Sequence, residues 1–359
     1  MTEKCTYETP YIVKQRNVGL IIVFALVVIV GLFYVKWNPY YAKAFVAASK
    51  HSIGASIISG KAGVAPVPSW ATAISYMTAY FTSVWKAVIL GLLVGSLVQV
   101  AIPKNWIQRL MGSRKFGSTA AAGITSLPTM MCTCCAAPVA VGLRNSSASI
   151  NAALAFFLGN PTLNPATIIF MGFVLGWNFA VFRIVMGLIL VFGISTLAAR
   201  FSKDDKVDTD ILVPKSETIE TTENNENLLV RWLKALLQLL IDTIPAYIIV
   251  VAILGALRAW LFPQVNPVWG HSVWAIIMLA FTGTLFVIPT AGEIPIIQTL
   301  MAFGLGTGPA AALLITLPAV SLPSLIIIKR AFPKRVLVLV GISVAVIGII
   351  SGFIGMAIL

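Results

Sequence analysis

Three of the chain's four cysteines lie within four positions of one another, at Cys132, Cys134 and Cys135. They stand in the apolar stretch MMCTCCAAPVAVGLRNSS, and Pro138 follows the last of them by three residues. Thiolates are soft ligands that suit Cu(I), Zn and similar ions, and trivalent arsenic is also thiol-seeking. Three interpretations are therefore open: a disulfide, a site for a thiol-reactive solute, and the packing of small buried residues.

Two acidic residues stand apart from the others. Of the twelve acidic residues, eight fall in 201–230 and two in the N-terminal tail, which leaves Asp242 and Glu293 in apolar sequence. Ionisable groups inside a membrane are costly and are functional candidates by default. Both carboxyls are therefore predicted to couple transport to protons. The alternative for Asp242 is an interfacial carboxyl or a partner of Lys86.

The stretch GNPTLNP interrupts a predicted helix twice, at Pro161 and Pro165, and frees backbone polar groups there. Two asparagines add side-chain amides at the same place. In carriers built from inverted repeats such breaks bind substrate or ions; the alternative is a kink satisfied by neighbouring helices. The predicted substrate-binding residues are Cys132, Cys134, Cys135, Pro138, Asn160, Asn164 and Glu293.

Positioning these residues requires elements that hold them in a membrane. Of the 359 residues, 58% are hydrophobic and only 10% are charged, whereas soluble domains carry about 25% charged residues. A membrane-crossing helix needs about 20 apolar residues. We therefore predict an all-α polytopic membrane protein surrounded by the lipid bilayer. The seven expected spans are 18–36, 77–102, 148–172, 178–199, 232–261, 309–328 and 336–358.

The basic residues predict the orientation. The first apolar run is longer than the about 7–15 residues of a signal sequence, so it is expected to be retained. The stretch YVKWNPYY after it is typical of an aromatic and basic membrane interface. The net charge of +13 is explained by clusters of Lys and Arg at one membrane face rather than by nucleic-acid binding. The prediction is a multi-pass protein of the cell membrane with a cytoplasmic N-terminus. Cytosol-facing thiols stay reduced, which disfavours a disulfide.

Two further segments, 117–144 and 272–304, are broken by Pro and Gly and are predicted to be re-entrant hairpins at the centre of the molecule. The acidic segment 201–230 is predicted to be a flexible linker. The predicted organisation is an N-terminal anchor helix with an external loop (1–70), a first transmembrane repeat (71–200), a cytoplasmic linker (201–230) and a second, inverted transmembrane repeat (231–359).

The inverted repeat is predicted from the spacing of prolines. Pro161 follows Pro138 by 23 residues, and Pro318 follows Pro295 by the same interval. Each half has a span, a hairpin and two further spans. The first span of the second half is predicted to cross the membrane in the direction opposite to the first span of the first half. This order is typical of secondary transporters, whose substrate sites lie where broken helices of the two halves meet. The alternative is chance recurrence of Pro and Gly, which are frequent in membrane helices.

The stretch CTCCAAPVAVGL, followed by INAALAFFLGNPTLNPA, resembles the predicted-permease family that includes YraQ and the ArsP organoarsenical efflux permeases. The later stretch AALLITLPAVSLPSLIII is similar to that family's second repeat, and the resemblance covers roughly 77–358. It implies a multi-spanning permease, and some members export trivalent organoarsenicals. By this resemblance Cys132 and Cys134 match the family's C-x-C pair, whereas Cys135 and Ala136 depart from its small polar residues.

The predicted function is a secondary permease, not an enzyme, that exports a small thiol-reactive solute such as a trivalent organoarsenical. Protons are expected to drive it. A membrane thiol/disulfide redox protein and a soft-metal-ion carrier are the alternatives. The chain has no G-x-x-x-x-G-K-[ST] sequence, which excludes ATP hydrolysis by this chain. Its two histidines, His51 and His271, lie outside the hairpin tips, which disfavours a histidine metal site. No cofactor, resident metal or oligomeric state is predicted.

Overall fold

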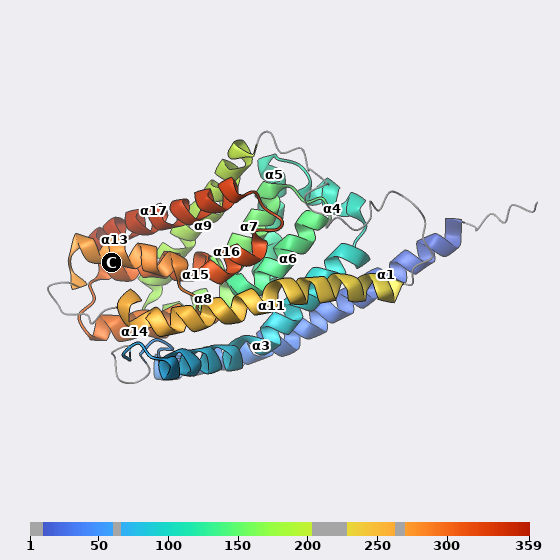
Figure 1. The fold of residues 1–359 in the computed structure, drawn as a ribbon. Helices are drawn as coiled ribbons and strands as arrows, with labels where there is room; N and C mark the ends of the chain where they lie inside the picture. Colours follow the sequence, from blue (N-terminus) through green and yellow to red (C-terminus); the bar gives the residue numbers. More distant parts are fainter. Residues whose placement is uncertain (1–9, 60–65, 203–227, 263–269) are drawn as a thin grey trace, which may run out of the picture.

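The computed structural model describes residues 10–59, 66–202, 228–262 and 270–359. All regular elements in these ranges are helices (Figure 1). Among the described residues, seven helical segments are long and apolar enough to cross a membrane, which agrees with the number predicted. These segments are Ile21–Lys50, Trp70–Ala101, Ile150–Val174, Trp177–Phe201, Leu229–Leu261, Thr307–Ile328 and Lys334–Ile358.

The first helical rod is longer than predicted. It consists of α1 (Pro10–Leu32), the π-helical turn η1 (Phe33–Trp37) and α2 (Asn38–Lys50). Helix continues through YVKWNPYY, the stretch predicted as a membrane interface, and the side chain of Lys36 within it is only 3% exposed. Pro39, which has no backbone N–H, lies directly after the π-helical turn, where Asn38 N–H donates to the carbonyl of Phe33 and the regular α-helical bonding pattern is interrupted.

Two long helices, α3 (Trp70–Ala101) and α11 (Leu228–Leu261), pack against each other, and α1 lies beside α3 (Figure 1). The short helix α4 (Lys104–Met111) follows α3 and contacts the next helix. Most of the linker predicted at 201–230 lies outside the described residues, as does part of the predicted external loop.

Both predicted hairpin segments are broken helices. The first contains α5 (Phe116–Ser126), the 3-10 turn η2 (Leu127–Thr129) and α6 (Thr133–Asn145). The second contains α13 (Val273–Leu285) and α14 (Glu293–Ala302). At a rise of about 1.5 Å per residue, each of these helices is shorter than the about 30 Å hydrocarbon core of a bilayer.

A broken span and an unbroken span follow each of these segments. The broken spans are α7 (Ile150–Thr162) with α8 (Pro165–Val174), and α15 (Thr307–Ala319) with α16 (Leu322–Ile328). The unbroken ones are α9 (Trp177–Phe201) and α17 (Lys334–Ile358). In the most apolar window of each broken span 83% of residues are buried, against 11% for the first rod. The broken spans therefore form the centre of the molecule, and most of the first rod lies at its periphery.

Candidate functional site

The interruptions of the two short-helix pairs carry strained backbone. We call residues 127–132 the first break and residues 286–292 the second break. Met130 has φ 48° just before α6, and Ala291 has φ 65° just before α14. Positive φ is unfavourable for residues other than glycine, and such strain concentrates at functional sites. Each break therefore contains one residue with positive φ shortly before the helix that follows.

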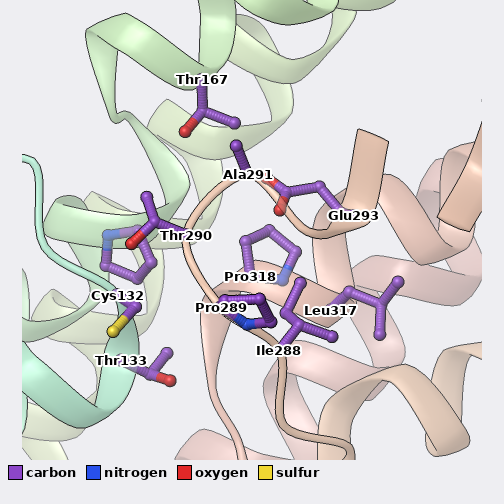
Figure 2. Close-up of a pocket in the computed structure, with 11 residues that line it drawn as sticks. Cys132, Thr133, Thr167, Ile288, Pro289, Thr290, Ala291, Glu293, Leu317 and Pro318 are labelled. Atoms are coloured by element: carbon purple, nitrogen blue, oxygen red, sulfur yellow. The ribbon is translucent and has the colours of Figure 1, made fainter. Parts of the chain in front are cut away.

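A small pocket lies where the two breaks meet. Figure 2 shows Cys132 and Thr133 on one side of the loop 288–291, and Glu293 and Pro318 on the other side. The pocket has a volume of about 10 Å³, which is about the space needed for one water molecule. In this conformation the pocket has no room for a solute larger than a water molecule.

The three clustered cysteines are buried, unbridged thiols. The Sγ atoms of Cys132, the extended N-cap residue of α6, and Cys135, in the first turn of that helix, are 2.9 Å apart. Cys134 faces elsewhere: its Sγ is 3.7 Å from Tyr80 Oη and 3.8 Å from Ser321 Oγ. Two thiols thus converge at the start of α6, and the third belongs to a hydroxyl-lined region.

Asn160 holds the first break in place. Its Oδ1 accepts hydrogen bonds from the backbone N–H of Met131, at 3.1 Å, and from the hydroxyl of Thr129. Its Nδ2 donates to the carbonyl of Phe156 at 3.1 Å. A buried N–H without a partner is costly. The amide oxygen of Asn160 supplies the acceptor that the N–H of Met131 does not find in the interrupted helix. Asn160 supports the first break and is not among the residues that line the pocket.

Asn164 and Pro138 also lie behind the pocket rather than in its wall. The side chain of Asn164 caps α8, accepting from the N–H groups of Ala166 and Thr167 at 3.1 and 3.3 Å. Pro138 lies inside α6, and its carbonyl comes so close to α3 that a Cβ on Gly95 would be 2.6 Å away. Of the predicted residues, Cys132 and Glu293 line the pocket.

Glu293 forms a buried ion pair that the sequence analysis missed. Its Oε1 lies 2.5 Å from Nη1 of Arg183, and both side chains are at most 2% exposed. Arg183 also donates from Nε to the carbonyl of Thr162, at 2.9 Å, and from Nη2 to that of Pro161, at 2.7 Å. Arg183 on α9 thus joins the end of α7 to the start of α14. Its position inside the predicted span 178–199 was the available signal.

Asp242 does not line the central pocket. Its Oδ2 lies 2.5 Å from Nη1 of Arg330, which follows α16 in the basic cluster 329–335. Its side chain is 17% exposed and that of Arg330 is 63% exposed. The predicted alternative partner Lys86 instead lies with its Nζ 5.5 Å from the ring centroid of Trp85. Asp242 is therefore a partly exposed carboxyl paired with the basic cluster.

The π-helical turn η1 contacts both breaks. The Nζ of Lys36 donates to Tyr40 Oη at 3.1 Å and to Thr290 Oγ1, in the second break, at 3.2 Å. The next residue, Trp37, donates from Nε1 to the carbonyl of Pro128 in the first break at 2.8 Å. Single π turns inside α-helices are frequent at functional sites. Lys36 is thus a second site residue that the sequence analysis missed, because the first span was predicted to end there.

A buried chain of tyrosines connects the second break to Cys134. The hydroxyl of Tyr76 donates to the carbonyl of Val287. Tyr76 and Tyr80 stack with ring centroids 6.1 Å apart, and Tyr80 Oη is 2.6 Å from Tyr247 Oη on α11. These polar ring ends lie where the two long helices meet the breaks. Within the described residues, no three His, Cys, Asp or Glu side chains are placed to hold a metal ion.

Seven candidate spans around broken central helices, with buried charges and thiols at the breaks, define a multi-pass membrane transport protein. The chain belongs to the predicted permease family ArsP_1, whose model matches residues 69–356. It is 50% identical over 339 residues to the UPF0718 protein YraQ of Escherichia coli K12, covering 94% of each chain. It is also 25% identical over 330 residues to the UPF0718 protein MJ0584 of Methanocaldococcus jannaschii, covering 75% of this chain and 90% of that protein. No solved structure matches the chain.

Proposed function

We propose that this permease moves its solute through the centre of the molecule, between the first and second breaks. The observation that carries this proposal is the pocket between the breaks, which brings Cys132 of one half together with Thr290 and Glu293 of the other. In this proposal the two short-helix pairs are re-entrant hairpins of inverted repeats that rock against each other. The equal order of elements in the two halves and the strained residue before α6 and α14 support it.

The cross-half contacts are the groups expected to change partners as access alternates. Arg183 and Glu293 connect the two halves at one side of the pocket. Thr133 Oγ1 and Ser321 Oγ connect them at the other side, at 3.2 Å. The starts of α6 and α16 therefore face each other. Interrupted helical backbone at membrane depth is tolerated where it is buried in protein or lines a cavity.

The proposed substrate is a small thiol-reactive solute, such as a trivalent organoarsenical, and the proposed direction is export. An arsenic(III) centre with one organic substituent has two exchangeable positions, which two converging thiols can fill. Cys132 and Cys135 supply such a pair with sulfurs 2.9 Å apart. Soft ligands of this kind favour soft centres.

The test is accumulation of methyl- and phenylarsenite in cells that express the native chain or single cysteine variants. Cys132→Ser and Cys135→Ser are expected to lose export while still inserting in the membrane. Cys134→Ser is the matched control, because its thiol faces Tyr80 rather than the converging pair, and it is expected to keep most export. Unchanged arsenical accumulation with the native chain would reject arsenicals as the substrate.

Proton coupling is proposed to act through Glu293, with Asp242 as the second proton-coupling candidate. Protonation of Glu293 would remove the negative partner of Arg183 and favour the separation of α9 from α14. In everted vesicles, Glu293→Gln is expected to permit exchange of solute but to abolish uptake driven by a proton gradient. Asp242→Asn tests the second candidate in the same assay. Native transport that ignores an uncoupler would contradict proton coupling.

A membrane thiol/disulfide function is the second candidate. Cys132 and Cys135 have the spacing C-x-x-C at the start of a helix, and their sulfurs are already 2.9 Å apart. This spacing and position favour a reactive thiol pair. Cycling between thiol and disulfide during turnover, measured by alkylation and mass spectrometry, would support the redox function. Thiols that stay reduced throughout transport would support the permease function. For a soft-metal-ion carrier, adding the metal ion would protect the thiols from alkylation.

A further inference from the structure

A second, larger cavity lies beside the central pocket. It has a volume of about 690 Å³ and extends between α2, α3, residues 53–57 and the second break. It shares residues 289–291 with the central pocket, so the loop drawn through the middle of Figure 2 forms a wall of both. This shared loop lies between the large cavity and the pocket that contains Cys132. The large cavity is therefore placed to be an antechamber of the central pocket.

The charged side chains that line this cavity are all positive. Lys36, Lys43 and Lys86 line it, and none of its lining residues in the described part of the chain is an Asp or Glu. The remaining polar wall is made by hydroxyl groups of Tyr40, Ser and Thr residues. A cleft lined by charges of one sign concentrates ions of the opposite sign. The cavity is thus suited to an anion.

Lys36 is the innermost of these cations. Its side chain is buried, and the hydrogen-bond acceptors of its ammonium, Tyr40 and Thr290, are both neutral. The ion pairs found among the described residues commit Glu293 to Arg183 and Asp242 to Arg330, so neither carboxylate serves Lys36. Besides Tyr40, the titratable groups that interact with its ammonium are the thiols of Cys135 and Cys132, which lie toward the central pocket. An ammonium has three donors, and burying one without a counter-charge is costly. An anion beside Lys36 would relieve that cost.

The start of α14 adds positive potential at the same place. Gly292, which precedes α14, and Pro295, in the first turn of that helix, line the cavity together with Thr290. The N–H groups of Gly292 and Ile294 already donate to the carbonyls of Pro289 and Ala291, and Pro295 has no N–H. The contribution of α14 is therefore the positive end of its dipole, which favours negative charge. The helix start and Lys36 lie on the same side of the cavity, at the wall shared with the central pocket.

We propose that this cavity is a binding chamber for a small anion, such as a carboxylate or an oxyanion, whose charged group lies between Lys36, Thr290 and the start of α14. The proposal rests on the proposed function, because the bound anion is taken to be the solute that proceeds into the central pocket. It deepens that function by assigning a negative charge to the solute. A thiol-reactive solute that fits would carry an acidic substituent besides its reactive centre.

Charge selectivity of the chamber can be measured without knowing the solute. A reporter cysteine replaces Ser83, an exposed residue of the cavity wall. The variant is treated with the anionic sulfonatoethyl or the cationic trimethylammonioethyl methanethiosulfonate, and modification of residue 83 is followed by mass spectrometry. Each rate is divided by the rate with free mercaptoethanol. The matched control is Ser49→Cys, an exposed residue of α2 that does not line the cavity.

The anionic reagent is expected to be favoured at position 83 by about tenfold, and hardly at position 49. Lys36→Gln and Lys86→Gln should each reduce this preference, whereas Lys36→Arg should keep it. Lys86 is exposed, so Lys86→Gln remains informative if Lys36→Gln does not fold. Equal normalised rates at positions 83 and 49, or a preference that both lysine variants leave unchanged, would overturn the proposal.

Transport separates this proposal from the proposed function. Vesicles are offered phenylarsenite or its ring-carboxylated analogue. Preference for the carboxylated compound, lost in Lys36→Gln, supports both proposals. Equal transport of the two compounds keeps the thiol-guided permease and rejects the anion chamber. If neither is transported while the reporter keeps its anion preference, the arsenical substrate fails and the anion chamber stands.

Discussion

Arg183 is a buried charge whose guanidinium is held by three acceptor groups. Its guanidinium is fully buried between the carboxylate of Glu293 and the carbonyls of Pro161 and Thr162. Removing one partner of a buried ion pair leaves an uncompensated charge, which costs about 3–5 kcal/mol. Arg183→Met is therefore expected to lower the free energy of unfolding by about that amount, measured by thermal unfolding in detergent.

The double variant Arg183→Met/Glu293→Met is the control for that prediction. It removes both charges and should recover part of the loss, although the two carbonyls stay without their donor. A double variant that is less stable than Arg183→Met alone would mean that Glu293 has another favourable partner.

Asn160 is expected to determine the conformation of the first break. Asn160→Ala leaves the N–H of Met131 without its acceptor, and a buried unsatisfied group costs about 1–3 kcal/mol. We expect a loss of stability in that range, together with faster alkylation of Cys132. The matched control is Asn145→Ala, at an exposed asparagine that bonds Gln99, which should have little effect. Equal losses from both variants would contradict a special role for Asn160.

The site residues were only partly predictable. The rarity of acids in apolar sequence identified Glu293, and the cysteine spacing identified Cys132. Arg183 could have been identified in the same way, because a charge inside a predicted span needs a partner. Lys36 could not, since an aromatic and basic stretch before a proline is typical of a helix end. Only the continued rod through η1 brings that lysine to the centre.

At the scale of elements, α3 and α6 are in unusually close contact. A Cβ on Gly91 of α3 would lie 2.5 Å from the backbone carbonyl oxygen of Cys135. Small residues permit such close approach of membrane helices. Gly91→Ala should therefore separate the helices, at a cost of about 1–3 kcal/mol, and reduce transport by displacing the thiols.

Gly193→Ala on α9 is the control, because nothing lies within 4 Å of its added Cβ. Alanine in an exposed helix position is favoured over glycine by about 0.5–1 kcal/mol, so that variant should be neutral or slightly more stable. Thermal unfolding of both variants checks the difference. If Gly91→Ala is as stable as the control, the contact is looser than described.

The elements themselves were largely predictable from apolar runs and from the positions of prolines. The bounds of α9, predicted at 178–199, are Trp177–Phe201, and the broken segments lie where Pro and Gly interrupt 117–144 and 272–304. Such long patterns are fixed by the thickness of a bilayer. The direction in which Cys134 faces was not predictable, because it depends on where α6 starts within the first break.

At the scale of the whole molecule, the proposed orientation has a measurable consequence. If all seven candidate spans cross the membrane, the two ends of the chain lie on opposite sides of it. The positive-inside rule then predicts a cytoplasmic N-terminus. A reporter that is active only outside the cytoplasm should work when fused after Leu359 and fail when fused before Met1. A cytoplasmic reporter should give the reverse result. The same response at both ends would contradict an odd number of spans.

The contacts of η1 have a consequence for what counts as the smallest working unit. The family model begins at residue 69, yet Lys36 and Trp37, from the rod that precedes it, bond to Thr290 and Pro128 in the two breaks. A chain shortened to the matched segment would retain every cysteine of the cluster and Glu293 but would lose Lys36 and Trp37, which bond to the two breaks. The segment that carries the family resemblance is therefore shorter than the segment needed to form all the contacts at the two breaks.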